Sequence, residues 1–221
     1  MNAPVTIATT MRWLHEEGLA RLAGAGGGAA EALWAYTIEV ATGRVTGYPV
    51  AGDGQGAEVL SLPADELPAP LQTAKRLVVV GVTTAECVLV VDLATVQSIA
   101  VEADRPEETA RAWVLQLLLN PEVTVTTNSA AVVVADAPRC RHSFIPGGGA
   151  TIVNVDDRRL PVTAITLNPA EDGPNHVDVA ADGTGELYLG ARYWKLAEVL
   201  RIDDQTWGDL AATLEQEEQS A

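Results

Sequence analysis

The sequence predicts an α+β (or α/β) fold, in which a mixed, largely antiparallel sheet is covered by two or three helices. Several apolar segments of strand length follow one another without an intervening helix, which disfavours a doubly wound parallel sheet. Apolar residues recur at helical spacing between residues 104 and 120, and similar spacing occurs near both ends of the chain. With 221 residues, 48% of them hydrophobic and 20% charged, the chain can bury a sizeable core.

The chain is expected to have three parts. Residues 1–28 hold an N-terminal helix with a glycine-rich joint, residues 29–217 form a single α/β domain, and residues 218–221 are a frayed acidic tail. The helix is predicted from about Thr10 to Ala23, and Gly24–Gly28 is expected to break it, because glycine loses the most backbone entropy on ordering. The helix would then be an appendage that docks on the body of the protein or on a partner.

A hairpin is predicted after this joint, because apolar and polar residues alternate from Trp34 to Val40 and return as residues 45–50 after a Thr-Gly turn. Gly47 and Pro49 weaken the returning strand, which places it at a sheet edge. Residues 51–73 are rich in Gly, Pro, Ala and acidic residues, and they predict a long surface loop with one helical turn at most.

The densest apolar pattern lies between Lys75 and Pro121. It predicts two strands joined by a short turn, a third strand, and then a helix that Asp104 caps with Glu107 three residues later. Asn120-Pro121 ends this helix. The strands are expected at 77–82, 87–93 and 96–101, and the buried stripe of the helix at Ala110, Trp113, Val114, Leu117 and Leu118.

The second half of the domain is predicted to consist mainly of short strands. Asp182-Gly183 is a turn signal, and the chain closes with a helix from about Asp204 to Gln216, whose apolar face includes Trp207. The further strands are expected at 123–127, 131–135, 151–155, 160–167, 177–180 and 186–189.

Two stretches resemble an uncharacterised α/β module of actinobacterial proteins. The first is the run Leu77–Gly81, Leu89–Leu93 and Ile99–Val101 followed by the helix with Trp113, and the second is the pattern from Val177 to the closing helix. The module occurs in large regulatory or membrane proteins, some of which carry LysM or transcriptional-activator domains. The resemblance covers about 75–120 and 176–217; it implies a fold and an actinobacterial origin, and it implies no activity.

Charge and hydropathy exclude several classes of function. A formal net charge of −16 repels phosphate backbones and anionic headgroups, so nucleic acid is not an expected partner. No uninterrupted apolar segment is long enough for membrane insertion, and the N-terminus lacks the pattern of a signal peptide. The two cysteines, Cys87 and Cys140, provide no disulfide framework. We therefore expect a cytoplasmic protein.

Cys140 and His142 form the sharpest reactive cluster in the sequence. A thiol nucleophile needs a base within reach, neighbouring arginines favour a thiolate, and the Gly147–Gly149 loop downstream could bind an oxyanion. These residues define a weak candidate catalytic site, and with it the alternative that the protein is an enzyme or a small-molecule binder. The glycines of residues 52–56 lack the strand–loop–helix context of a nucleotide-binding loop, and no cofactor is expected.

Paired carboxylates are the other candidate ligands. Asp156-Asp157 is interpreted as a polar turn, and Asp203-Asp204 as acidic residues favoured at a helix N-terminus. The three histidines are scattered. The sequence therefore predicts no metal site.

Aromatic residues favour a different function. Trp13, Trp34, Tyr188, Tyr193 and Trp194 lie in segments that are expected to reach the surface, and aromatic side chains are enriched at interfaces. In the absence of a catalytic motif, we predict a non-catalytic interaction or accessory protein that binds a protein partner or associates with itself. A homodimer formed through the edge strand 45–50 is the variant of this hypothesis that involves self-association.

Overall fold

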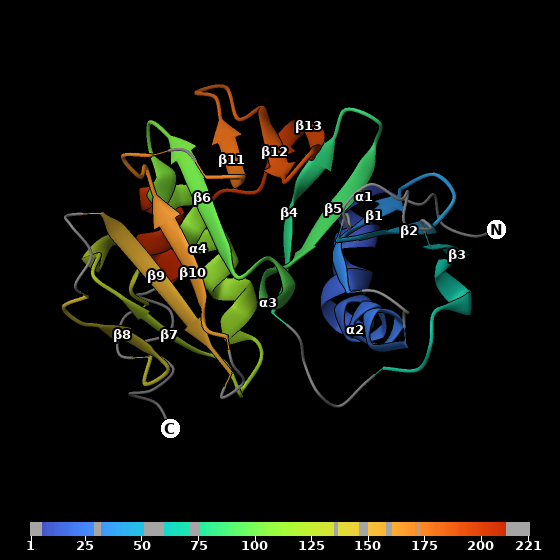
Figure 1. The fold of residues 1–221 in the computed structure, drawn as a ribbon, viewed down its shortest axis with the longest axis horizontal. Helices are drawn as coiled ribbons and strands as arrows, with labels where there is room; N and C mark the ends of the chain where they lie inside the picture. The colour runs from blue at the N-terminus through green and yellow to red at the C-terminus, as the bar shows by residue number, and fades with distance from the viewer. Residues whose placement is uncertain are drawn as a thin grey trace.

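The computed structural model describes residues 6–28, 32–50, 60–70, 76–134, 137–145, 150–157, 161–171 and 173–210. Thirteen strands form one mixed sheet in the order β3-β2-β1-β5-β4-β13-β12-β11-β6-β10-β9-β7-β8 (Figure 1). The prediction of a sheet covered by two or three helices is wrong, because the sheet dominates the molecule and the helices are few and short. The segment expected to be a surface loop contributes a strand at the edge of the sheet.

The N-terminal helix is one continuous element with a π-helical turn in its middle. It consists of α1 (Ile7–Trp13), the π turn η1 (Leu14–Gly18) and α2 (Leu19–Gly28), and Thr6 caps its start. The expected break at Gly24–Gly28 is therefore wrong. Leu22, Ala23 and Ala25 are buried against the sheet, and this packing outweighs a helix penalty of about 1 kcal/mol per glycine.

The first three strands differ from the sequence prediction in two respects, the edge strand and the loop that follows it. β1 (Leu33–Glu39) pairs with β2 (Arg44–Pro49), and β2 pairs in turn with β3 (Leu60–Pro63), all antiparallel. β2 is therefore not an edge strand, because β3 occupies the edge inside the segment expected to be a loop. The glycine in β2 has a packing role, since a Cβ at Gly47 would lie 3.0 Å from the side chain of Leu33. A 3-10 turn, η2 (Ala64–Glu66), follows β3.

The central region follows the predicted pattern within a few residues. The hairpin of β4 (Leu77–Thr83) and β5 (Cys87–Asp92) is followed by the short helix α3 (Leu93–Val96), by β6 (Ser98–Ala103) and by α4 (Pro106–Leu118). The expected cap is wrong, because the N-cap residue is Arg105 and no side-chain hydrogen bond caps the helix. Pro106 fixes the first turn instead.

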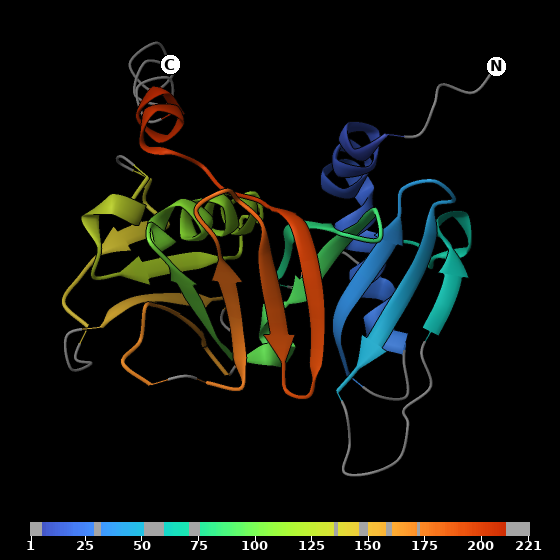
Figure 2. The same cartoon turned by 90° about the horizontal axis from the view of Figure 1, so that it is seen from above.

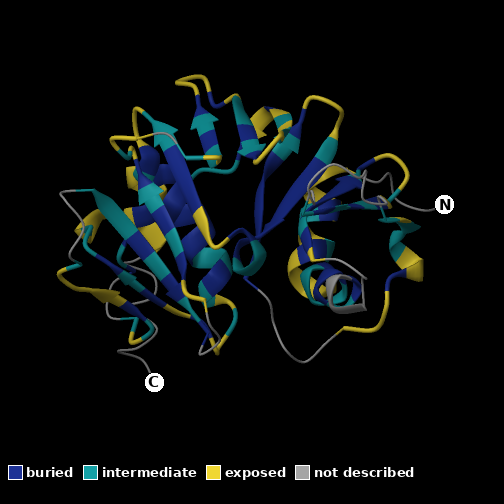
Figure 3. Ribbon diagram, viewed as in Figure 1, coloured by how far each residue is buried: buried dark blue, intermediate teal, exposed yellow. Residues whose placement is uncertain are grey.

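Alternate residues of the β4–β5 hairpin belong to two different cores. Val78, Val80, Leu89 and Val91 pack with the residues under α4, which include Trp113. The alternating set, Leu77, Val79, Val88 and Val90, packs with Leu14 and Leu22 of the N-terminal helix. Both faces of this hairpin are therefore buried, as Figure 3 shows, and the continuous apolar sequence follows from that.

The remaining strands extend the sheet on one side, where β6 pairs in parallel with both β10 and β11. Figure 2 shows the sheet as a curved wall, with α4 against one part and the N-terminal helix against another. A 3-10 turn, η3 (Ala130–Val132), follows β7, and residues 204–210 are helical. The bounds are β7 (Thr124–Thr127), β8 (Cys140–His142), β9 (Thr151–Asp156), β10 (Thr163–Leu167), β11 (Asn175–Val179), β12 (Gly185–Leu189) and β13 (Arg192–Val199).

A buried ion pair ties the start of β4 to the β9–β10 connection. Arg76 is 1% exposed and donates to Asp157 Oδ1 at 2.7 Å, to the Pro161 carbonyl oxygen at 2.6 Å and to Thr163 Oγ1 at 2.9 Å. The ion pair with Arg76 thus gives the Asp157 carboxylate a structural role.

Candidate functional site

The structure separates Cys140 from His142. Cys140 is only 4% exposed and lies in the core under α4, and its Sγ faces the Val132 carbonyl oxygen. Burial raises the pKa of the Cys140 thiol, which is the reverse of what a nucleophilic thiolate needs. His142 is exposed, and its Nε2 lies 3.2 Å from the Asn128 carbonyl oxygen. The Gly147–Gly149 loop lies outside the described residues. Among the described residues, the burial of Cys140 argues against an activated thiol there.

The carboxylate pair Asp203-Asp204 anchors the last described helix. Asp203 Oδ1 accepts from the Thr206 backbone N–H, and Asp204 Oδ1 lies 2.7 Å from an Arg111 nitrogen. The hydrogen bond from Arg111 lowers the pKa of Asp204, and the charge of Arg105 adds to this effect. Within the described ranges, no group of three or more His, Cys, Asp or Glu side chains could hold a metal ion.

The five aromatic residues predicted to bind a partner do not form one surface. The Trp13 indole donates to Glu17 Oε1 at 2.9 Å, beside the N-terminal helix. Trp34 and Trp194 pack against the core under α4. The Trp194 ring lies edge-on to Tyr48 at 5.2 Å, so that it links β13 to β2 across the curved sheet. These three tryptophans have packing roles that the sequence did not indicate.

Tyr188 and Tyr193 instead lie on the face of the sheet that points away from the core under α4, together with a histidine. Val177, Leu187 and Trp194 point into the core under α4, so the alternate residues of β11, β12 and β13 face away from it; we call this side the outer face. Three directly paired residues form a stack there. The rings of His176 and Tyr188 lie 4.6 Å apart, and those of Tyr188 and Tyr193 lie 6.0 Å apart. We call this stack, His176–Tyr188–Tyr193, the aromatic ladder.

Carboxylates border the aromatic ladder. Tyr188 donates a hydrogen bond to Glu186, and this hydrogen bond is the main cause that raises the pKa of Tyr188. Asp178 Oδ1 lies 3.9 Å from His176 Nε2, and Lys195 Nζ lies 3.9 Å from Glu186 Oε1. Tyr193 is 59% exposed. The outer face therefore presents a stack of aromatic rings, with Glu186, Asp178 and Lys195 beside it.

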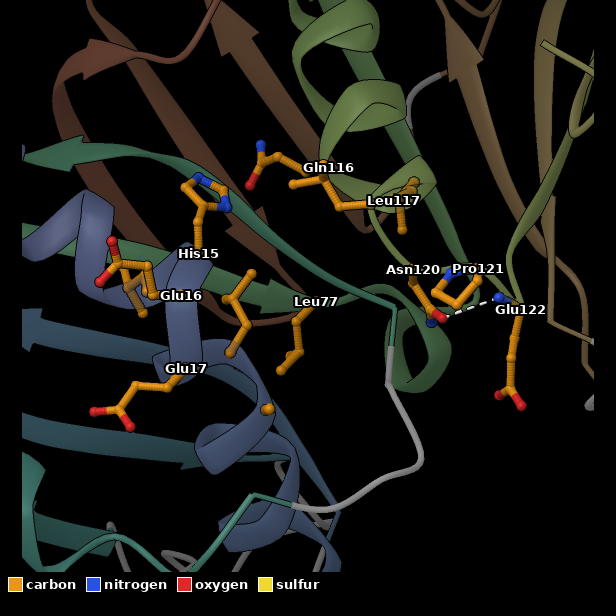
Figure 4. A pocket seen from close by; sticks show the side chains of 13 residues that line it. His15, Glu16, Glu17, Leu77, Gln116, Leu117, Asn120, Pro121 and Glu122 are labelled. Atoms are coloured by element: carbon orange, nitrogen blue, oxygen red, sulfur yellow. Dashed lines mark hydrogen bonds between the residues drawn. The ribbon is translucent and has the colours of Figure 1, made fainter. Parts of the chain in front are cut away.

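A groove lies elsewhere, between the N-terminal helix and the C-terminal end of α4 (Figure 4). Its volume is about 350 Å³. β13 pairs with β4 only from Gly81 onward. Before Gly81, the Gln116 side chain binds the backbone of Val79 in β4. The lining residues are Leu14, His15, Glu16, Glu17, Leu19, Ala20, Leu77, Gln116, Leu117, Leu119, Asn120, Pro121 and Glu122.

The comparisons with known proteins add no name to these sites. No protein-family model, no curated protein and no solved structure matches the chain. The resemblance to the actinobacterial module therefore stays a prediction. Among the residues that the structure describes, no helix is long and apolar enough to cross a membrane.

Sequence reasoning missed His176 and the groove. Strand alternation places Tyr188 and Leu187 on opposite faces of the sheet. Only the register between β11 and β12 shows that His176 stacks on Tyr188. The groove brings together residues near positions 15, 77 and 120, and no local pattern connects these segments.

Proposed function

We propose that the protein is a non-catalytic binding protein that docks a protein partner on the outer face of β11, β12 and β13. The aromatic ladder is the observation that carries this proposal. Three rings are held in line by direct strand pairing, and Tyr193 is more than half exposed. Rigid aromatic side chains give large contact areas at little entropic cost, which makes them frequent anchors of interfaces.

The charge beside the ladder indicates a basic partner. Glu186 and Asp178 border the rings, Lys195 is the basic side chain paired with Glu186, and the whole chain has a net charge of −16. A guanidinium group can stack on a tyrosine ring and pair with a neighbouring carboxylate at the same time. We therefore propose that the partner presents arginine side chains to the ladder, and that the negative field of the protein accelerates the encounter.

The proposal is tested with defined peptides. A tetra-arginine peptide should bind more tightly than a tetra-lysine peptide, because the planar guanidinium stacks on aromatic rings, and a tetra-glutamate peptide should not bind. Tyr193→Ala should weaken binding of tetra-arginine by about two- to five-fold, the loss expected for one exposed cation–π contact. Isothermal titration calorimetry at low and moderate salt measures both effects.

Phe144→Ala is the matched control. Phe144 is 87% exposed and lies outside the ladder, so this variant also removes one exposed aromatic ring. Equal losses in Tyr193→Ala and Phe144→Ala, or binding that ranks lysine above arginine, would contradict a specific role for the ladder.

A further inference from the structure

His176 is held in one tautomer at the end of the aromatic ladder. Its Nδ1 lies 2.8 Å from the Gly173 carbonyl oxygen, and its ring stacks on Tyr188 with an angle of 21° between the two planes. A carbonyl oxygen can only accept a hydrogen bond, so Nδ1 carries the proton when the ring is neutral. The other nitrogen, Nε2, then carries the lone pair.

The Nε2 atom lies next to a carboxylate oxygen that lacks a donor. Asp178 Oδ1 is 3.9 Å from Nε2. Among the described residues this oxygen has no hydrogen-bond partner, and it is covered from solvent although the Asp178 side chain as a whole is 49% exposed. Two neighbouring acceptors gain attraction when one of them takes up a proton. Protonation of Nε2 therefore turns this pair of acceptors into an ion pair.

The wider surroundings of His176 also favour a positive charge on its ring. Asp178 is paired directly with Glu102 on one side and with Glu186 on the other, and paired residues share a face of the sheet. Lys195 is the basic side chain of this row, and it pairs with Glu186. The titratable groups around His176 are Asp178 on β11, Glu102 on β6, Glu186 and Tyr188 on β12, Tyr193 and Lys195 on β13, and Glu171 in the connection before β11.

From the fixed tautomer, the ring stack and the adjoining carboxylate we infer that His176 is a proton-sensitive switch of the aromatic ladder, and that protonation of its ring weakens the binding of an arginine-bearing partner. This inference rests on the function proposed above. The imidazolium would engage Asp178, one of the carboxylates that border the rings, and would repel a guanidinium stacked on the neighbouring tyrosines. Histidine side chains change charge between about pH 5 and 8. Binding should therefore weaken as the pH falls through this range.

The test uses tetra-arginine with both termini blocked, because the charge of this peptide stays constant between about pH 5.5 and 7.5. Its affinity for the full chain is measured by isothermal titration calorimetry at both pH values and at one ionic strength. We expect binding about three- to ten-fold weaker at pH 5.5, which is the effect of one added charge at close range. Aspartate and glutamate side chains generally titrate at about pH 4, below this window.

Histidine variants assign the effect to one residue. His176→Phe keeps an aromatic ring that cannot be protonated, so the ratio of its affinities at the two pH values should be close to one. His142→Phe is the matched control, because His142 is exposed and lies on β8 at the far edge of the sheet. This control should keep the ratio of the unmodified chain. The comparison uses ratios within each protein, so a change in the affinity of a variant does not affect it.

Proton release provides a second measurement that needs no variant. If the switch exists, binding of tetra-arginine near pH 6.5 should release a fraction of a proton per peptide, since the cation and the proton compete. Titrations in two buffers with different ionisation enthalpies give this number.

The failure of the switch differs from the failure of the proposed function. Absence of tetra-arginine binding at pH 7.5 would contradict the binding function of the ladder, and the switch with it. Binding at pH 7.5 with equal affinity at pH 5.5, with an equal pH effect in His176→Phe, or without proton release would overturn the switch alone.

Discussion

At the scale of single residues, the environment of Cys140 decides its chemistry. Its thiol is buried among apolar side chains. The preceding residue, Arg139, donates to the carbonyl oxygens of Leu118, Asn120 and Val123. The Arg139 guanidinium is therefore hydrogen-bonded to carbonyl oxygens around the C-terminal end of α4. Cys140 is a packing residue in the described structure.

Thiol labelling tests this assignment. Burial raises the pKa of both cysteines, and Cys87 is partly exposed, so Cys140 should react much more slowly than Cys87 at neutral pH in the native protein. The two should react alike in urea. Because the folded pKa of Cys140 is raised, its contribution to stability is present below the unfolded pKa and is lost as pH rises through the folded value. Rapid labelling of native Cys140 near pH 7 would contradict this account.

Arg76 is a residue whose loss should lower stability strongly, because its ion pair with Asp157 is buried. Arg76→Met leaves the Asp157 carboxylate buried without this cation, which is expected to lower the free energy of unfolding by about 3–5 kcal/mol. Lys195→Met, which removes an exposed pair at 3.9 Å, should change it by less than about 1 kcal/mol. Urea denaturation measures both, and similar effects of the two substitutions would show that the buried pair has no special role.

At the scale of elements, the π turn depends on Gly18. A Cβ at this position would lie 2.9 Å from the Trp13 ring, so Gly18→Ala should displace the ring and destabilise the protein by about 1–3 kcal/mol. Gly208 in the last described helix has open space around it, and Gly208→Ala is expected to be neutral or to stabilise by up to about 1 kcal/mol. Thermal unfolding compares the two variants; a stable Gly18→Ala would show that the ring does not hold the turn.

Elements with strong local patterns could be predicted from the sequence. The hairpin β4–β5 and helix α4 lie within a few residues of their predicted positions, because long apolar runs and helical spacing are local signals. The predictions failed where tertiary packing outweighs local preference. Glycines continue α2 because its buried face packs on the sheet, and β3 forms in a loop-like sequence because β2 offers a free edge.

The candidate sites could be predicted only in part. Tyr188 and Tyr193 were expected to reach the surface, and the structure pairs them directly across β12 and β13. Trp194 was grouped with them, but side chains alternate along a strand and it therefore faces the core. Strand pairing, which sequence alternation does not reveal, adds His176 to the ladder.

At the scale of the whole molecule, one continuous sheet contributes both to the buried cores and to an exposed aromatic surface. Alternate residues of the central hairpin are buried in two cores, whereas the outer face of β11–β13 has the aromatic ladder on its surface. The chain as a whole has a net charge of −16, which favours encounters with basic partners. We therefore propose that a partner binds on the outer face of β11–β13.

The most direct test of the central claim is a map of where an arginine peptide contacts the protein. Tetra-arginine is titrated into the ¹⁵N-labelled chain, and shifts of the backbone amide signals are placed on the structure. We expect the largest shifts at His176, Tyr188 and Tyr193, with saturation at one site. Shifts that spread evenly over the acidic surface, or that concentrate away from β11–β13, would contradict a binding function of the aromatic ladder.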